Sequence, residues 1–100
     1  MKLSEAIRKG CELYPVPCTG RFYNPETGCV CALGAAYVGL GNVIDDKDYN
    51  TVIGVLNEAY PELGCEDDGW TLGCDIADLN DKRGKTREEI ADWLEKEHNL

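Results

Sequence analysis

Apolar residues recur three and four positions apart near the start of the chain, which is the pattern of an amphipathic helix. This stretch begins at Ser4, a residue type that caps helices, and stops before Pro15 and Pro17. The residues on its apolar face are Leu3, Ala6, Ile7, Gly10, Cys11 and Tyr14. The sequence therefore predicts a first helix with Cys11 turned toward the core.

The stretch GCVCALGAAYVG, residues 28–39, has a different pattern. From Cys31 to Gly39 it contains no charged residue, and a helix that is apolar on all sides is buried on all sides. Gly41 and Asn42 then provide a stop signal. We expect this segment to be the central helix of the fold.

Three more helices follow from the same periodicity. One runs from about residue 50 to Tyr60, a short one covers 74–79, and the last begins at Thr86, where Thr-x-x-Glu with Glu89 forms a capping box. Before the central helix, an extended run and the turn residues 24–28 predict a small β-hairpin at about residues 19–31. The expected fold is mainly α: a compact single domain, residues 1–100, of four to five helices with one hairpin.

Charge is spread unevenly along the chain. The net charge is −9, and residues 45–81 hold eleven acidic residues against a single base, Lys47. Phosphate binding depends on Lys and Arg, so we expect no direct nucleic-acid binding. The acidic segment predicts either a solvated face or a contact with a basic protein partner. The candidate partner-binding residues are Glu66, Asp67, Asp68 and Asp75.

Basic residues gather in one place, between the last two predicted helices. Lys82, Arg83, Lys85 and Arg87 lie there, and the helix that follows them is rich in acidic residues. Because such a helix is a poor surface for the major groove, we expect these bases to form ion pairs rather than to read DNA.

No membrane or export segment is evident in the sequence. The longest apolar runs are far shorter than a membrane span, and the first residues lack the apolar core of a signal peptide. We therefore predict a cytoplasmic protein with no membrane partner.

The six cysteines allow several kinds of chemistry. Cys11, Cys18, Cys29 and Cys31 are enough thiolates for a tetrahedral zinc site, although their spacing lacks the usual C-x2-C knuckle. Two pairs flank loops and are candidate disulfides: Cys18 with Cys29, and Cys65 with Cys74. In a reducing cytosol the leading interpretation is buried, reduced packing thiols, with no cofactor bound.

A cysteine nucleophile is the remaining alternative. Cys31 is placed at a helix N-terminus, which favours a thiolate. A cysteine hydrolase also needs a base, and the single histidine, His98, lies two residues from the end of the chain. We assign no catalytic residue.

Two strings, CALGAA at Cys31–Ala36 and LNDKRGKTREEIADWLE at Leu79–Glu95, resemble a family of small uncharacterised bacterial and phage proteins. These proteins pair a Cys-x-x-Gly-Ala helix with a Leu/Trp-Asn-Asp turn before a capped C-terminal helix. The resemblance covers the first helix, the central helix and the C-terminal third, and it implies no known activity. It draws attention to Asn80 and Asp81, which form either a helix-ending turn pair or a polar site beside Cys31.

Two functions are consistent with these observations. The first is a non-enzymatic interaction or accessory protein, of phage or prophage type, that binds a basic protein. The alternative is a thiol-based protein with a zinc or redox-active centre around Cys29 and Cys31.

Overall fold

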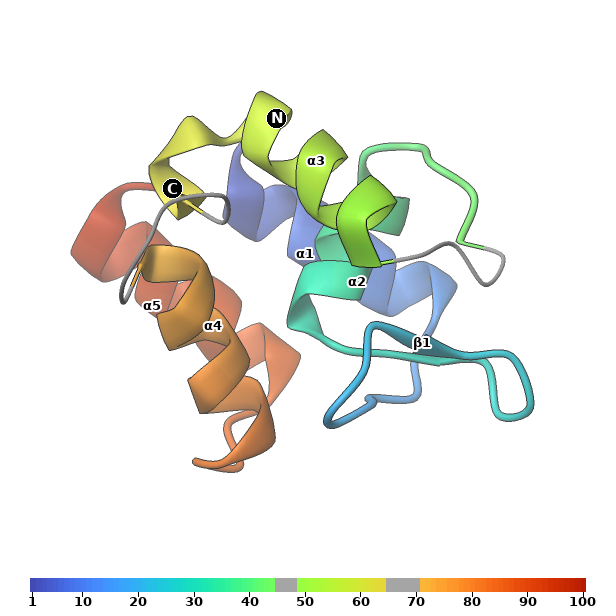
Figure 1. The fold of residues 1–100 in the computed structure, drawn as a ribbon. Coiled ribbons are helices and arrows are strands. Elements are labelled where there is room, and N and C mark those ends of the chain that lie inside the picture. The colour runs from blue at the N-terminus through green and yellow to red at the C-terminus, as the bar shows by residue number, and fades with distance from the viewer. Residues whose placement is uncertain (45–48, 65–70) are drawn as a thin grey trace.

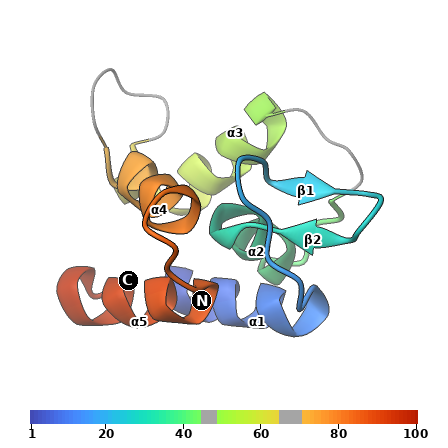
Figure 2. The same ribbon diagram turned by 90° about the horizontal axis from the view of Figure 1, so that it is seen from below.

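The fold was analysed in a computed structural model, which describes residues 1–44, 49–64 and 71–100. The chain forms helices α1 (Leu3–Leu13), α2 (Ala32–Gly39), α3 (Tyr49–Ala59), α4 (Leu72–Asp81) and α5 (Arg87–His98), a short 3₁₀ helix η1 (Pro61–Leu63) and a hairpin of β1 (Tyr23–Asn24) and β2 (Cys29–Val30). Figure 2 shows α1 and α5 in one layer, with the hairpin and the other helices in a second layer over them. The predicted mainly helical fold with one small hairpin is confirmed.

The central helix is α2, as its composition predicts. All eight of its residues are buried, and it packs against α1, α3 and α4 (Figure 1). It crosses α1 closely, because Gly10 of α1 faces Ala35 and Gly39 of α2 faces Ala6 of α1. A Cβ atom on Gly10 would lie 2.6 Å from the Cα atom of Ala35, so only glycine fits there. The small residues in α1 and α2 therefore set the distance between the two helices.

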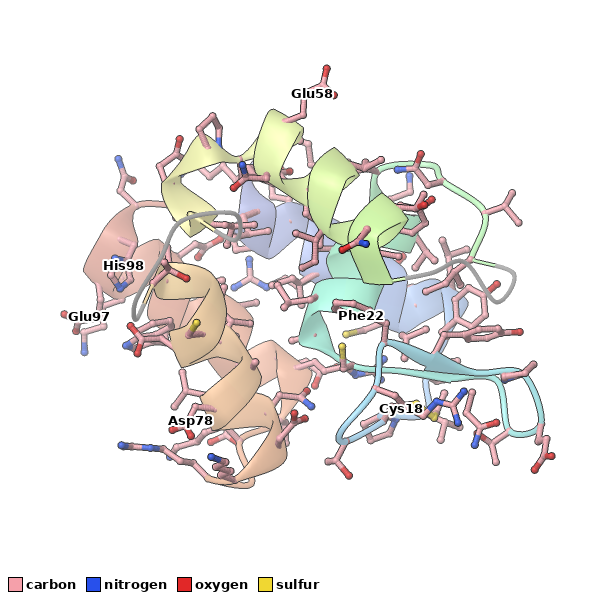
Figure 3. The ribbon with its side chains drawn as sticks, viewed as in Figure 1. Cys18, Phe22, Glu58, Asp78, Glu97 and His98 are labelled. Carbon is pink, nitrogen blue, oxygen red and sulfur yellow. A yellow bond between two sulfur atoms is a disulfide. The ribbon has the colours of Figure 1, made fainter. Side chains whose placement is uncertain are left out.

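The hairpin is short, and a disulfide ties it to the segment before β1. Tyr23 pairs with Val30 and Asn24 with Cys29 in antiparallel register. Cys29 of β2 is also bonded to Cys18, with 5.1 Å between their Cα atoms (Figure 3). Since two strands alone are marginally stable, the disulfide and the helices beneath hold this segment in place.

The last helix begins where the sequence predicts. Thr86 Oγ1 accepts the N–H of Glu89, and a Glu89 carboxylate oxygen accepts the N–H of Thr86, which completes the capping box. The first helix begins differently from the prediction. Its N-cap is Lys2, and Ser4 lies buried inside the helix, where its hydroxyl donates to Glu95 and to the Leu100 carbonyl. Ser4 thus connects the two ends of the chain instead of capping α1.

The basic residues before α5 separate into two kinds. Arg83 pairs with Asp78 at 3.0 Å, which confirms the expected internal ion pairing for that residue. Arg87 is buried, and its guanidinium donates to the carbonyl oxygens of Tyr14 (2.6 Å), Pro15 (2.7 Å) and Val30 (3.4 Å). Arg87 thus joins the end of α1 to the hairpin, and the ion pairs found among the described residues do not include it.

Among the helices of the described residues, none combines the length and the apolar character that crossing a bilayer requires.

Candidate functional site

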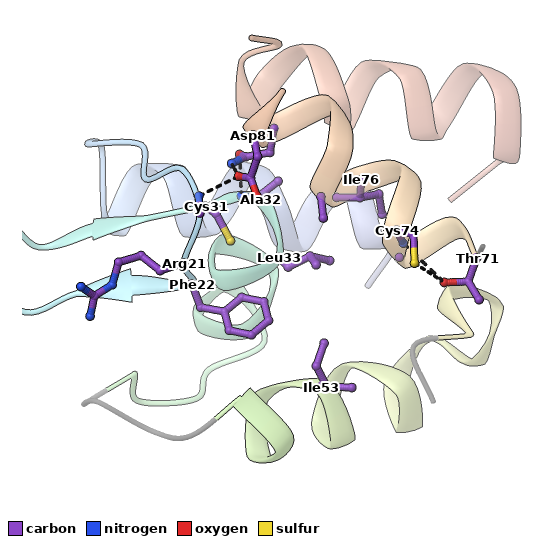
Figure 4. A pocket seen from close by; sticks show the side chains of 14 residues that line it. Arg21, Phe22, Cys31, Ala32, Leu33, Ile53, Thr71, Cys74, Ile76 and Asp81 are labelled. Carbon is purple, nitrogen blue, oxygen red and sulfur yellow. Dashed lines mark hydrogen bonds between the residues drawn. The ribbon is translucent and has the colours of Figure 1, made fainter. Parts of the chain in front are cut away.

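A cavity of about 200 Å³ opens between the hairpin, α2, α3 and α4 (Figure 4). Its walls are mainly apolar side chains: Phe22 from the loop before β1, Leu33 from α2, Ile53 from α3, and Ile76 and Ala77 from α4. Its polar lining groups are Cys31, Thr71, Cys74, Asn80, Asp81 and Arg21. Figure 4 shows the Arg21 guanidinium directed away from the cavity, and its Nε donates to the Tyr23 carbonyl.

Asn80 holds the polar end of the cavity together. Its side chain is buried, and Oδ1 accepts the N–H of Ala32 at 3.1 Å. Its Nδ2 donates to the Cys18 carbonyl at 2.9 Å and to Asp81 Oδ1 at 2.7 Å. One amide thus joins the C-terminal end of α4 to the first turn of α2 and to Cys18, in the segment before the hairpin.

Asp81 completes this arrangement at the rim. Its side chain is exposed, and Oδ1 also accepts the N–H of Gly20 at 3.0 Å. The resemblance suggested either a turn pair or a polar site beside Cys31. The structure places Asn80 and Asp81 at the end of α4 and beside Cys31 in the cavity wall. The pair thus ends a helix, as the first alternative has it, and also lies beside Cys31, while its role as a functional polar site stays a prediction.

Cys31 is the N-cap residue of α2. Its Sγ accepts the N–H of Gly34 at 3.3 Å, while its own N–H donates to the Phe22 carbonyl at 3.1 Å. Burial raises the pKa of the Cys31 thiol to about 11, since it outweighs the lowering by the N–H groups of Gly34 and Leu33, and the charge of Asp81 adds to the rise. At neutral pH the group is a protonated thiol, which is a poor nucleophile.

Cys74 faces the same cavity from the first turn of α4. It is partly exposed, Thr71 Oγ1 donates to its Sγ at 3.4 Å, and the same hydroxyl accepts the Cys74 N–H. These bonds from Thr71 lower the pKa of Cys74. The cavity therefore contains two thiols of opposite character, a buried protonated one and an accessible one that ionises more readily.

The predicted cysteine chemistry divides along the same lines. Cys18 and Cys29 form a disulfide, so the interpretation of reduced packing thiols is wrong for these two residues. Cys11 and Cys31 are buried free thiols, as that interpretation predicts. The bond also occupies two of the four thiolates of the predicted zinc set, and no group of metal-binding side chains is found among the described residues. For the second predicted pair, Cys65 lies outside the described residues, and Cys74 is a free thiol, so the predicted bridge between them is wrong.

The remaining candidates lie elsewhere. Glu66, Asp67 and Asp68 fall outside the described residues, and Asp75 is partly buried on α4 beside Cys74. His98 stacks edge-on against Trp93 on α5, 4.7 Å between ring centroids, and it is well separated from Phe22 in Figure 3. The histidine is not among the residues that line the cavity.

Sequence reasoning missed the apolar walls of the site. In the sequence, Phe22 belongs only to the extended run before the turn residues, and Ile53 only to the helix expected from about residue 50 to Tyr60. Their convergence depends on how α3 and the hairpin pack around α2, which no local pattern contains. The one available signal was Phe22 itself, the single phenylalanine of the chain, next to a predicted turn.

Comparison with known proteins adds a family but no activity. Residues 17–97 match a described family of unknown function, DUF6197, while no curated protein and no solved structure matches the chain. The match begins after α1 and includes the middle of the chain, which the resemblance left uncovered. An uncharacterised family is thus confirmed, whereas phage or prophage origin stays a prediction. The chain belongs to the family of unknown function DUF6197.

Proposed function

We propose that this chain is a non-enzymatic binding protein that recognises a basic protein partner. The observation that carries the proposal is the cavity, which has apolar walls and an exposed carboxylate, Asp81, at its rim. Ligand-binding pockets commonly have this composition, in which a few polar groups are set in an apolar lining.

The chemistry of the lining supports binding over catalysis. Cys31 is protonated at neutral pH, and the amide of Asn80 is fully used in internal bonds. A thiol hydrolase would need a base next to the sulfur, and the lining residues include no histidine.

The charge of the chain supports a basic partner. The net charge is −9, and residues 45–81, which include α3 and α4 on two sides of the cavity, carry eleven acids and one base. Opposite charge on a partner speeds association and selects against acidic competitors. The predicted contacts Glu66, Asp67 and Asp68 belong to this segment, and their part in the contact stays a prediction.

A peptide-display selection tests this function. Random peptides are selected on the wild-type protein, on Asp75→Asn/Asp81→Asn, and on Glu12→Gln/Glu26→Gln, a control that removes the same charge from exposed residues away from the cavity. We expect enriched peptides with a net positive charge, whose binding weakens with added salt and on the first variant but not on the control. Enrichment of neutral or acidic peptides, or equal weakening by both variants, would contradict the proposal.

A further inference from the structure

We infer that the cavity receives one large apolar side chain of the partner, and that Asp81 binds a lysine or arginine next to that side chain. This inference rests on the proposed function and names the part of the partner that the cavity recognises.

The size of the cavity selects the class of ligand. Pockets for drug-sized molecules and cofactors measure roughly 300–1,000 Å³. A cavity of about 200 Å³ is too small for these ligands and matches one leucine, methionine or phenylalanine side chain. Single side chains that fill a dry pocket are the usual centres of protein–protein contacts.

The backbone groups at the closed end are already paired. The N–H groups of Cys31, Ala32 and Gly34 donate to Phe22, Asn80 and Cys31 respectively. The start of α2 therefore offers no free donor to a phosphate or carboxylate from these three residues, although a helix N-terminus often binds anions. The interior of the cavity is suited to an apolar group.

The rim has the opposite character. Asp81 Oδ1 accepts the N–H groups of Gly20 and Asn80, and within the described part of the chain no hydrogen bond to Oδ2 is recorded. Among the described residues that line the cavity, Arg21 alone is basic, and its side chain extends away from the cavity (Figure 4). An ammonium or guanidinium group beside a bound apolar side chain therefore meets a fixed carboxylate that is charged and accessible.

Five-residue peptides test this inference directly. The probes are fluorescein-labelled Lys-Lys-Leu-Lys-Lys, the same peptide with a central alanine, and Glu-Glu-Leu-Glu-Glu, with affinity measured by anisotropy. We expect each altered peptide to bind at least about tenfold more weakly than the first. Equal binding of the leucine and alanine peptides would overturn the apolar anchor. Equal binding of the acidic peptide would overturn the role of Asp81.

Two variants locate the contact. Ala77→Met places a larger side chain in the cavity from partly exposed α4, and it should reduce binding of the leucine peptide at least about tenfold. Asp81→Asn keeps the oxygen that accepts from Gly20 and Asn80, so the fold is retained while the charge is lost. We expect it to weaken binding at least about threefold, against less than about twofold for the control Glu26→Gln.

The outcomes separate this inference from the proposed function. Basic peptides that bind the wild type, with no effect of Ala77→Met or of the central residue, would overturn the cavity as the contact and leave the proposed function standing. Failure of the displayed library to yield any basic peptide would contradict the proposed function itself.

Discussion

Gly39→Ala is expected to destabilise the protein by about 3 kcal/mol or more, because the new methyl group meets the backbone of the neighbouring helix. A Cβ atom there would lie 2.6 Å from the carbonyl carbon of Ala6 and closer still to its oxygen. Neither atom is able to rotate away, so α1 and α2 must separate. For a chain of this size, the melting temperature should fall by more than about 10 °C in a thermal unfolding experiment followed by circular dichroism.

Gly54→Ala is the matched control for this prediction. Gly54 lies within α3, and a Cβ atom added to it meets nothing within 4 Å. Alanine in a helix interior is favoured over glycine by about 0.5–1 kcal/mol, so this variant should melt slightly higher than the wild type. If Gly39→Ala melted within a few degrees of Gly54→Ala, the close crossing of α1 and α2 would be wrong.

Asn80→Asp has the second largest expected effect, with a marked dependence on pH. The new carboxylate would replace the Nδ2 donor that now binds the Cys18 carbonyl and Asp81. It would bury a charge against two acceptors, at a cost of about 3–5 kcal/mol at neutral pH. The bond from the Ala32 N–H of α2 would still find an acceptor oxygen, whereas the bonds to the Cys18 carbonyl and to Asp81 would be lost.

The sign of the pH dependence follows from the same contacts. Burial and the charge of Asp81 raise the pKa of the new carboxyl in the folded state above its unfolded value of about 3.9. The folded state then binds more protons than the unfolded state, so stability relative to the wild type falls as pH rises and recovers toward about pH 4.

Chemical denaturation at a series of pH values measures this effect, with Asn80→Leu as the control. Leucine loses these two bonds and also the acceptor for the Ala32 N–H, without adding a charge, so its deficit relative to the wild type should not change between acidic and neutral pH. If the loss of unfolding free energy in Asn80→Asp were likewise independent of pH, Asn80 would not lie against Cys18 and Asp81.

The sequence predicts the helices whose signals are local. The uncharged run from Cys31 to Gly39 corresponds to buried α2, and the Thr86–Glu89 capping box marks the start of α5. The hairpin likewise follows from the turn residues between its strands. In each case the residues that determine the structure lie within a few positions of one another.

Long-range partners account for what the sequence did not predict. Asn80 bonds to residues 48 and 62 positions away, and Arg87 reaches carbonyl oxygens 57 to 73 positions away. A local pattern offers only general tendencies for such residues, a turn for the first and an ion pair for the second. For the same reason, the sequence did not predict that Asn80 and Arg87 would both be buried joints.

The disulfide shows how an assumption about surroundings affects a prediction. The spacing of Cys18 and Cys29 around a hairpin favoured a bond, but the expectation of a reducing cytosol made free thiols the leading interpretation. The structure contains the bond. For this pair, the spacing of the two cysteines around the hairpin predicted the bond correctly, whereas the expected reducing compartment did not.

The central claim is that the cavity is a binding site with an unreactive thiol rather than a thiol active site. Alkylation of the native protein by iodoacetamide at neutral pH, with site-resolved mass spectrometry, tests it most directly. Cys31 is buried with its pKa raised to about 11, while Cys74 is partly exposed with its pKa lowered. The account predicts that Cys74 is modified at least about fiftyfold faster than Cys31, and that Cys31 reacts only after unfolding. Modification of Cys31 within about tenfold of the rate at Cys74 would contradict the account and favour a thiol-based function.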